Sequence, residues 1–234
     1  MLYDKVSIEA VCESSILLRF SDEIDTKLPQ FINQVSELIY AQHADCIMNL
    51  TPSYTTLLID YLPYRTPENE MLISLAHIIH QVDSHDSTDE SNLITLPVYY
   101  DSEVAPDLIH LMESKELSKQ ELVNLHTQQE YKICAIGFTP GFGFLAGLPD
   151  KLATPRLSTP RLKVMKGSVG IADNQTAVYP SETPGGWNII GNCPISLFDP
   201  QSEFLSPLRI GDRIRFKPID KQQYIDLGGK LWAY

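Results

Sequence analysis

Two arginines follow the same Thr-Pro dipeptide, in Thr154-Pro155-Arg156 and again in Thr159-Pro160-Arg161. Each proline fixes its own φ and restricts the residue before it, so the backbone that carries the arginines is stiff. A guanidinium group binds carboxylate and phosphate oxygens through two parallel hydrogen bonds. Residues 151–172 contain five basic and no acidic residues. The stretch indicates either a site for a small anionic ligand or a basic loop that forms salt bridges with the acidic N-terminal part.

A second polar cluster follows at residues 167–187, where hydroxyl, amide and aromatic side chains alternate with glycines. Glycine permits positive φ and close backbone approach, so Gly185-Gly186 can turn N–H groups toward an anion or a developing oxyanion. Trp187 would then supply a flat apolar wall. Turn formation alone also explains the glycines, and Trp187 also fits a core position. The candidate ligand-binding residues of this region are Ser168, Gln175, Tyr179, Thr183, Pro184, Gly185, Gly186 and Trp187.

Histidines and known motifs give fewer indications. His126 stands near the end of a predicted helix, where an imidazole can act as a base near neutral pH or as a hydrogen-bonded structural group. His77 and His80 share a helix face and His85 lies beyond, but solvated or capping histidines explain them better than a metal site. Residues 141–146 match the dinucleotide-binding pattern G-x-G-x-x-A, yet Pro149 follows too soon for the required helix. No Walker loop, nucleophile elbow or zinc-protease helix occurs, and we predict no metal ligands.

Composition and charge exclude several classes of function. The chain has 234 residues, of which 43% are hydrophobic and 21% charged, as is typical of a soluble globular protein. The net charge of −12 disfavours binding to nucleic acid or to an anionic membrane. We find no apolar run that could span a bilayer and no signal peptide, so we expect a cytoplasmic protein. Widely spaced cysteines are predicted to be buried thiols: Cys12, Cys46, Cys134 and Cys193.

A polar, acidic segment at residues 83–92 has no apolar anchor and predicts an exposed linker. Residues 1–92 contain 15 acidic and four basic residues, whereas residues 93–234 contain 15 and 14. We therefore expect an acidic N-terminal domain over residues 1–92 and a second domain over residues 93–234.

The N-terminal domain shows the same order of elements twice. Strands are predicted at residues 6–11 and 15–20, and again at 46–50 and 54–61, and each pair precedes a helix. Pro67 suits the first position of the second helix. This order predicts an α+β layer, an antiparallel sheet with two helices on one face. The residues expected to face inward are Phe31, Ile32, Val35, Leu38 and Ile39 on the first helix and Met71, Leu72, Leu75, Ile78 and Ile79 on the second.

The second domain begins with a predicted strand at residues 93–100 and a short helix at residues 105–113. Ser118 and Glu121 form a capping box that starts another helix, which runs to about Thr127. From Tyr131 to Tyr234, short runs of Val, Ile, Tyr and Phe alternate with Gly and Pro clusters. This pattern predicts a β sandwich or barrel. The fold class is therefore α+β, with a small N-terminal α+β domain followed by a mainly β domain.

Several motifs together resemble the B-subunit family of 5-oxoprolinases, also known as the allophanate hydrolase subunit 1 or kinase A inhibitor (KipI)-like family. Most of the resemblance lies in residues 93–200. The matching segments are residues 53–58, 96–101, 125–127, 136–142, 154–161, 167–172, 175–180 and 183–190. The chain departs from the family pattern at Met165-Lys166, where proline and a small residue are usual. It also departs at Phe144, where tyrosine is common, and at Ala177, where glycine is.

The resemblance implies a cyclophilin-like C-terminal barrel and a role in the ATP-dependent opening of 5-oxo-L-proline to L-glutamate. The B and C subunits of the 5-oxoprolinase would together phosphorylate the lactam oxygen, and the A subunit would complete the hydrolysis. ATP would be shared with the partner subunit, and magnesium would accompany the nucleotide. Arg156 and Arg161 are expected to hold carboxylate or phosphate oxygens of an anionic substrate. Phe138, Pro140 and Gly141 join the candidate site through the matching motif at residues 136–142.

Two alternatives remain open within the same family. One is an inhibitor of a histidine kinase, in which the barrel binds a helical partner protein. The other is a subunit of allophanate hydrolase, which shares the logic of the site and differs in substrate. A binding module would act alone and tolerate the loss of Arg156, whereas an enzyme subunit would be inert until it is mixed with the C and A subunits.

Overall fold

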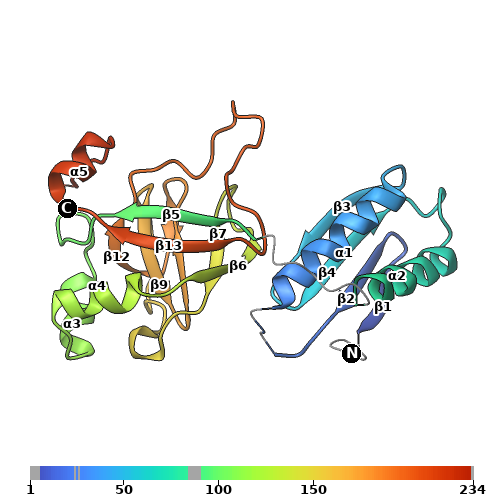
Figure 1. Cartoon of the computed structure of the whole chain (residues 1–234), viewed down its shortest axis with the longest axis horizontal. Helices are drawn as coiled ribbons and strands as arrows, with labels where there is room; N and C mark the ends of the chain where they lie inside the picture. The colour runs from blue at the N-terminus through green and yellow to red at the C-terminus, as the bar shows by residue number, and fades with distance from the viewer. Residues whose placement is uncertain (1–5, 24, 26, 84–90, 233–234) are drawn as a thin grey trace. The chain divides into compact units, whose positions relative to one another are not determined.

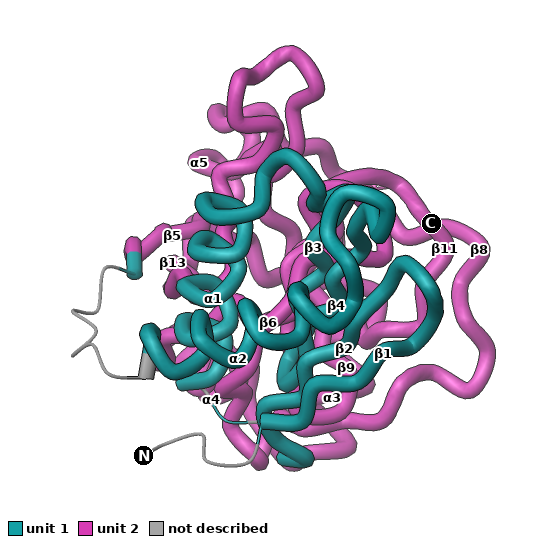
Figure 2. Tube along the Cα trace, turned by 90° about the vertical axis from the view of Figure 1, so that its right-hand side faces the viewer, with its two compact units in different colours: residues 1–91 teal, residues 92–234 magenta. Residues whose placement is uncertain are grey.

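The computed structural model describes residues 6–23, 25, 27–83 and 91–232 of the chain. These residues form two compact units, Met1–Ser91 and Asn92–Tyr234, which Figure 2 draws in teal and magenta. Most of the acidic linker predicted at residues 83–92 lies outside the described residues, as does His85. None of the helices in the described part of the chain combines the length and the apolar character that crossing a bilayer requires.

The first unit contains a four-stranded antiparallel sheet in the order β1-β2-β4-β3. Alternate strand residues face the core: Ile16 stands opposite Ile59, and Leu18 opposite Leu57, and all four are fully buried. One buried face and one exposed face are the result of the two-residue period of a strand. The elements are β1 (Ser7–Cys12), β2 (Ser15–Arg19), α1 (Leu28–His43), β3 (Ile47–Pro52), β4 (Thr56–Tyr61) and α2 (Glu68–Asp83).

Helices α1 and α2 lie side by side against this sheet (Figures 1 and 2). Their buried residues recur every three or four positions, so each helix turns one apolar face to the core. The predicted layer of two helices on an antiparallel sheet is confirmed. Leu38 and Leu72 are only partly buried, at the edge of the core. Pro67 precedes α2 by one residue, and its carbonyl accepts the first helical hydrogen bond, from the Met71 N–H.

The second unit is a β barrel built from seven strands in the order β12-β9-β10-β7-β6-β13-β5. Its outer strands meet where Tyr99 and Asn192 exchange two backbone hydrogen bonds of 2.9 Å, which closes the sheet. The predicted mainly β domain is thus confirmed as a barrel (Figure 1). The strands are β5 (Leu93–Val98), β6 (Tyr131–Ile136), β7 (Gly143–Ala146), β9 (Ser168–Ala172), β10 (Gln175–Val178), β12 (Asn188–Asn192) and β13 (Arg213–Pro218).

Outside the barrel sheet, β8 (Arg161–Val164) and β11 (Thr183–Gly185) form a separate two-stranded ribbon. Helix α3 (Leu108–Ser114) begins three residues later than predicted. Helix α4 (Lys119–Thr127) starts at the predicted capping box, in which Ser118 and Glu121 cap each other. The dinucleotide-binding pattern leads into β7 and then only a three-residue 3-10 turn, η1 (Asp150–Leu152), so no helix follows it.

Two expectations about the second unit and the cysteines need correction. The C-terminal region includes a helix, α5 (Lys221–Asp226), which begins with a reciprocal cap between Asp220 and Gln223. That acid-x-x-Gln spacing is a helix start signal that the β-rich surroundings obscured. All four cysteines are free thiols, but Cys12 is exposed and only the other three are buried. Cys12 lies at the end of β1, an edge strand of the first sheet, where less of the chain covers it.

Candidate functional site

A cavity of about 270 Å³ opens beside the β8–β11 ribbon, and its wall contains seven of the residues that the sequence singled out. Those seven are Phe138, Arg156, Tyr179, Pro184, Gly185, Gly186 and Trp187. Three further residues complete the lining: Phe142, Phe144 and Pro160. Phe142 and Pro160 stand within the matching motifs at residues 136–142 and 154–161, and Phe144 lies two residues beyond the first of them.

Aromatic rings form the walls of this cavity. The Phe142 ring lies at the centre, with its centroid 5.2 Å from that of Tyr179 and 5.6 Å from that of Trp187. Both contacts are edge-to-face, the arrangement that aromatic quadrupoles favour. Phe138 occupies the rim with 64% of its surface exposed and a φ of +70°. A strained backbone angle at a non-glycine residue is a feature that clusters at binding sites.

Arg156 supplies the positive charge of the cavity. Its guanidinium carbon lies 6.0 Å from the centroid of the Trp187 ring, within the range of a cation–π contact. Its nearest acidic partner is Asp173, at 3.8 Å from Nε, and 60% of the Arg156 side chain is exposed. Such a loose, solvent-exposed ion pair contributes little stability. The forked face of the guanidinium group is therefore available to a ligand anion at the mouth of the aromatic cavity.

Close packing explains Gly185, whereas Gly186 shows neither a close contact nor an unusual backbone angle. Neither Gly185 nor Gly186 has a positive φ, contrary to the expectation from the sequence. A Cβ atom on Gly185 would lie 2.4 Å from the Tyr179 hydroxyl oxygen, so only glycine allows this tyrosine to approach the ribbon. A Cβ on Gly186 would meet nothing closer than 3.6 Å.

Tyr179 is a neutral hydrogen-bonding group in this wall. Burial raises the pKa of its phenol to about 12, against the opposing effects of a hydrogen bond from the Trp187 backbone and the charges of Arg156 and Arg161. The side chain is 1% exposed and so fixed in place by its neighbours. It can position a ligand at neutral pH, but it does not act there as a phenolate.

Arg161 differs from Arg156 in its surroundings, which corrects the expectation that both arginines line one pocket. Its Nη2 atom donates to Oδ1 of Asp107 at 2.5 Å, and Oδ2 of Asp107 accepts from the Ile189 N–H at 2.7 Å. Asp107 is 7% exposed. Arg161 lines a separate cavity of about 520 Å³ on the ribbon. No sequence signal pointed to Asp107 as its partner, because 54 residues separate the two.

His126 has the surroundings of a structural histidine, the second of the two roles expected for it from the sequence. Its side chain is fully buried, with Nδ1 2.8 Å from the Tyr100 hydroxyl and Nε2 3.0 Å from the Thr176 hydroxyl. Its ring stacks on Phe216 at 4.5 Å between centroids. Burial lowers the pKa of His126 to about 3, so the imidazole is neutral at physiological pH.

The remaining candidates lie outside the lining of the aromatic cavity. Ser168 is buried and donates to the Met165 carbonyl at 2.6 Å. Gln175 pairs with Ala146 and Ala172 in the barrel sheet. Thr183 lies on the ribbon with a buried hydroxyl. Pro140 is exposed, and Gly141, with φ +80°, packs tightly against the backbone of Leu197.

Nothing in the described part of the chain forms a ready metal centre. No group of three or more His, Cys, Asp or Glu side chains comes together among those residues. His77 and His80 are both exposed on α2. The chemistry available to this cavity is therefore that of a cation, a phenol, backbone groups and aromatic faces.

Comparisons with known proteins identify the family of the chain. The carboxyltransferase domain, subdomain C and D, matches residues 6–208. The B subunit of the Bacillus subtilis 5-oxoprolinase is 32% identical over 94% of this chain and 95% of its own length. The chain belongs to the 5-oxoprolinase B-subunit family. The family member from Escherichia coli O157:H7 is 42% identical over 66% of this chain and 71% of its own length.

Solved structures of other proteins share the fold. TTHA0988 superposes with a TM-score of 0.78 at 30% identity, over 88% of this chain and 40% of that chain. The present chain therefore covers less than half the length of TTHA0988. PH0987 from Pyrococcus horikoshii is 33% identical, with a TM-score of 0.56 over 93% of this chain and all of its own. The urea carboxylase of Kluyveromyces lactis, at 15% identity and a TM-score of 0.71, shows the fold alone.

Proposed function

We propose that this chain is the B subunit of an ATP-dependent 5-oxoprolinase complex, acting with the C subunit to phosphorylate the lactam of 5-oxo-L-proline. Family membership supports the reaction class, because the related proteins from two bacteria carry that name. The observation that supports a substrate site on this chain is the cavity in which Arg156 overhangs aromatic walls. Its volume of about 270 Å³ suits a small ring that bears one carboxylate.

Each part of the cavity matches one part of such a substrate. Arg156 binds the carboxylate through its forked N–H groups, while the aromatic walls hold the apolar ring carbons and exclude water. The neutral Tyr179 phenol and the backbone of Gly185-Gly186 lie at the wall where the lactam group would rest. Holding the lactam oxygen in one position lowers the entropic part of the barrier to its phosphorylation.

Phosphorylation of the lactam oxygen solves a chemical problem. A lactam resists attack because its nitrogen lone pair is delocalised into the carbonyl group. Transfer of a phosphoryl group to the oxygen activates the lactam carbon. Water can then add to that carbon, the ring C–N bond breaks as the nitrogen takes up a proton, and the acyl phosphate that results reacts with a second water to give the carboxylate and inorganic phosphate. ATP would supply the phosphoryl group. Magnesium would accompany the nucleotide, and the A subunit would complete the hydrolysis.

The decisive experiment is ATP hydrolysis that depends on 5-oxoproline, measured with the chain mixed with the C and A subunits. Arg156→Ala should lower kcat/KM more than tenfold, because a charged hydrogen bond contributes roughly 1.5–3 kcal/mol. Arg156→Lys should restore part of the activity, since it keeps the charge and loses the fork. Arg209→Ala is the matched control, because Arg209 also lies over an aromatic ring, Phe204, but outside the cavity.

This assay and two further measurements separate the alternatives. Equal activity of Arg156→Ala and Arg209→Ala would remove the substrate site from this cavity. Turnover of allophanate in place of 5-oxoproline would identify the urea-degrading activity instead. Inhibition of a histidine kinase by the chain alone, unaffected by Arg156→Ala, would favour the binding module.

A further inference from the structure

A groove of about 400 Å³ opens between the neighbouring helices α1 and α2 of the first unit (Figure 2). Its lining residues come from both helices and are Gln34, Glu37, Leu38 and Ala41 on α1 and Gln81 and Val82 on α2. The four residues of α1 recur every three or four positions, so they share one face of that helix. The first and the last of them lie about 10 Å apart along the helix axis.

Three of the lining residues give this groove an apolar strip. Leu38 packs at the edge of the core and is only partly buried, and Val82 is 7% exposed. Ala41 is exposed and carries a single methyl group, so it leaves the space beside it unfilled. An apolar strip bordered by polar side chains is typical of a surface that binds another molecule.

The shape of the groove suits a helix. An amphipathic helix that docks in a groove inserts apolar side chains at positions i, i+3 or i+4, and i+7, which is the spacing of the lining residues on α1. Small residues at the contact allow two helices to approach closely, and Ala41 provides one. A third helix laid beside α1 and α2 would cover the apolar strip.

Charge indicates the kind of helix that the groove can accept. Residues 1–92 contain 15 acidic and four basic residues. No described acidic side chain of the first unit lies within ion-pairing distance of a described basic one. Glu37, in the wall of the groove, accepts a hydrogen bond from the Asn33 side-chain amide at 2.9 Å. The first unit therefore attracts a cationic partner and repels an anionic one.

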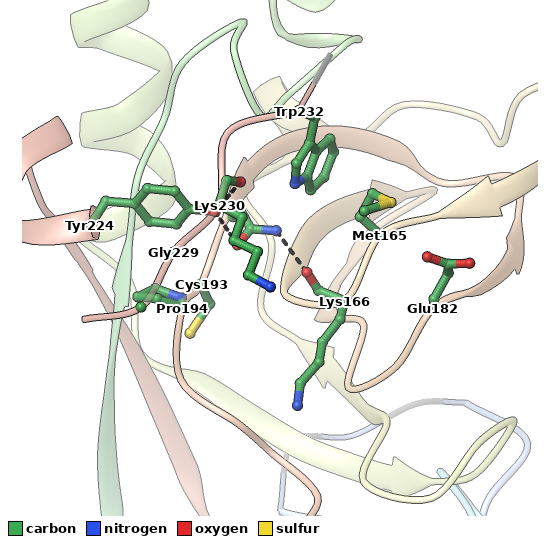
Figure 3. A pocket seen from close by; sticks show the side chains of 11 residues that line it. Met165, Lys166, Glu182, Cys193, Pro194, Tyr224, Gly229, Lys230 and Trp232 are labelled. Carbon is green, nitrogen blue, oxygen red and sulfur yellow. Dashed lines mark hydrogen bonds between the residues drawn. The ribbon is translucent and has the colours of Figure 1, made fainter. Parts of the chain in front are cut away.

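Several acidic side chains of the second unit, in contrast, meet basic partners inside that unit. The ion pairs between two described residues all lie there. Figure 3 shows Glu182 of that unit beside the cavity at Trp232, and this carboxylate pairs with Lys163 at 2.8 Å. The uncompensated negative charge thus belongs to the first unit, where the apolar groove also lies.

Two other occupants match the groove less well. A second copy of this chain would bring a unit with the same excess of negative charge, and the two Glu37 side chains would face each other across the contact. Residues 83–92, which follow α2 in the sequence, are acidic and contain no apolar side chain to fill the strip.

We infer that the groove between α1 and α2 binds a basic amphipathic helix of a partner protein. Apolar side chains of that helix cover Leu38, Ala41 and Val82, and its lysines or arginines lie beside Glu37. The inference is independent of the reaction proposed for the aromatic cavity, because residues of the second unit alone line that cavity.

A synthetic helical peptide tests the inference by fluorescence anisotropy with the full-length chain. The peptide has about 18 residues, with leucine at every third or fourth position and lysine at the others. Ala41→Gln should weaken its binding about tenfold, because the longer side chain fills the space that a leucine enters. Ala44→Gln is the matched control, since Ala44 is an exposed residue at the end of α1 outside the groove.

A second pair of variants tests the contribution of charge. Glu37→Gln should weaken binding of the same peptide about threefold, whereas Glu70→Gln should not, because Glu70 is an exposed acid of α2 that does not line the groove. A peptide of the same composition in scrambled order should bind at least about tenfold more weakly. A peptide with glutamate in place of lysine should not bind.

Four results would overturn the inference. They are no binding of the lysine–leucine peptide, equal affinity of Ala41→Gln and Ala44→Gln, equal affinity of the ordered and scrambled peptides, or a dimer of the chain in sedimentation experiments that Ala41→Gln abolishes. The last result would assign the groove to a second copy. Turnover of 5-oxoproline with the partner subunits is a separate measurement, so the proposed function and this inference can fail independently.

Discussion

Arg156 and Arg161 follow identical Thr-Pro dipeptides, yet the fold gives them different tasks. Arg156 remains 60% exposed above Trp187, with an acidic partner only at 3.8 Å. Arg161 begins β8 and is fixed by an ion pair with the buried Asp107. The prolines stiffen both stretches of backbone alike, so the difference comes from what the folded chain brings next to each side chain. A repeated motif therefore does not establish a repeated function.

The largest contrast should appear in stability. Arg161→Ala leaves Asp107 buried without its cation, and we expect a loss of about 2–4 kcal/mol in the free energy of unfolding, reduced by the partial exposure of Arg161. Arg156→Ala should change stability by less than about 0.5 kcal/mol. Denaturant titrations of both variants measure this. Equal losses in the two variants would show that the ion pair with Asp107 does not distinguish the arginines.

The two glycines beside the arginines provide the next comparison. Gly185→Ala places a methyl group 2.4 Å from the Tyr179 hydroxyl, which should cost about 1–3 kcal/mol and disturb the wall of the aromatic cavity. Gly186→Ala meets its first neighbour at 3.6 Å and is the matched control. Thermal unfolding and KM for 5-oxoproline in the complex should both change for Gly185→Ala. The tight approach of Tyr179 would be disproved if the two variants behaved alike.

The buried His126 should make the stability of the protein depend on pH, unlike an accessible histidine. Its pKa is about 3 in the folded protein and near 6.5 when unfolded, so the unfolded state binds the proton first as pH falls. The contribution of the neutral His126 to the free energy of unfolding is complete above pH 6.5. It is lost between pH 6.5 and 3, at up to about 1.4 kcal/mol per pH unit. Unfolding free energies from pH 7 to 4.5 should fall less steeply in His126→Gln.

His110→Gln is the control for that measurement, because it removes an exposed histidine from α3 of the same unit. If His126→Gln proves too unstable to study, the imidazole resonances of the unsubstituted chain can be followed by NMR. A His126 ring that titrates near pH 6.5 in the folded protein would contradict its buried, neutral state.

Thr183 should give the smallest effect. It was a candidate ligand-binding residue, but its hydroxyl is buried without a hydrogen-bond partner and does not line the aromatic cavity. Thr183→Val removes that unpaired group, so stability should stay the same or rise by up to about 1 kcal/mol, with unchanged turnover. A large fall in kcat would show that Thr183 takes part in the reaction although it lies outside the lining of the aromatic cavity.

Features encoded over a few residues could be predicted from the sequence. The capping box at Ser118 and Glu121, the two amphipathic helices of the first unit and the β-rich second unit all appear as expected. The Asp220-x-x-Gln223 signal of α5 is also local, but the surrounding residues favour strands and conceal it. Seven candidate residues around one cavity were also identifiable, since they cluster within short motifs.

Tertiary structure alone decided the rest. Asp107 meets Arg161 across 54 residues, and the barrel closes between Tyr99 and Asn192. Tyr179 reaches Gly185 only because separate strands fix both positions. The sequence by itself determined the local backbone and the chemical types of the side chains, through forces that act between near neighbours. Strand register and barrel closure determined that Arg156 stays accessible to a ligand and that His126 is shielded from water. Burial and ion pairing depend on segments that are distant along the chain.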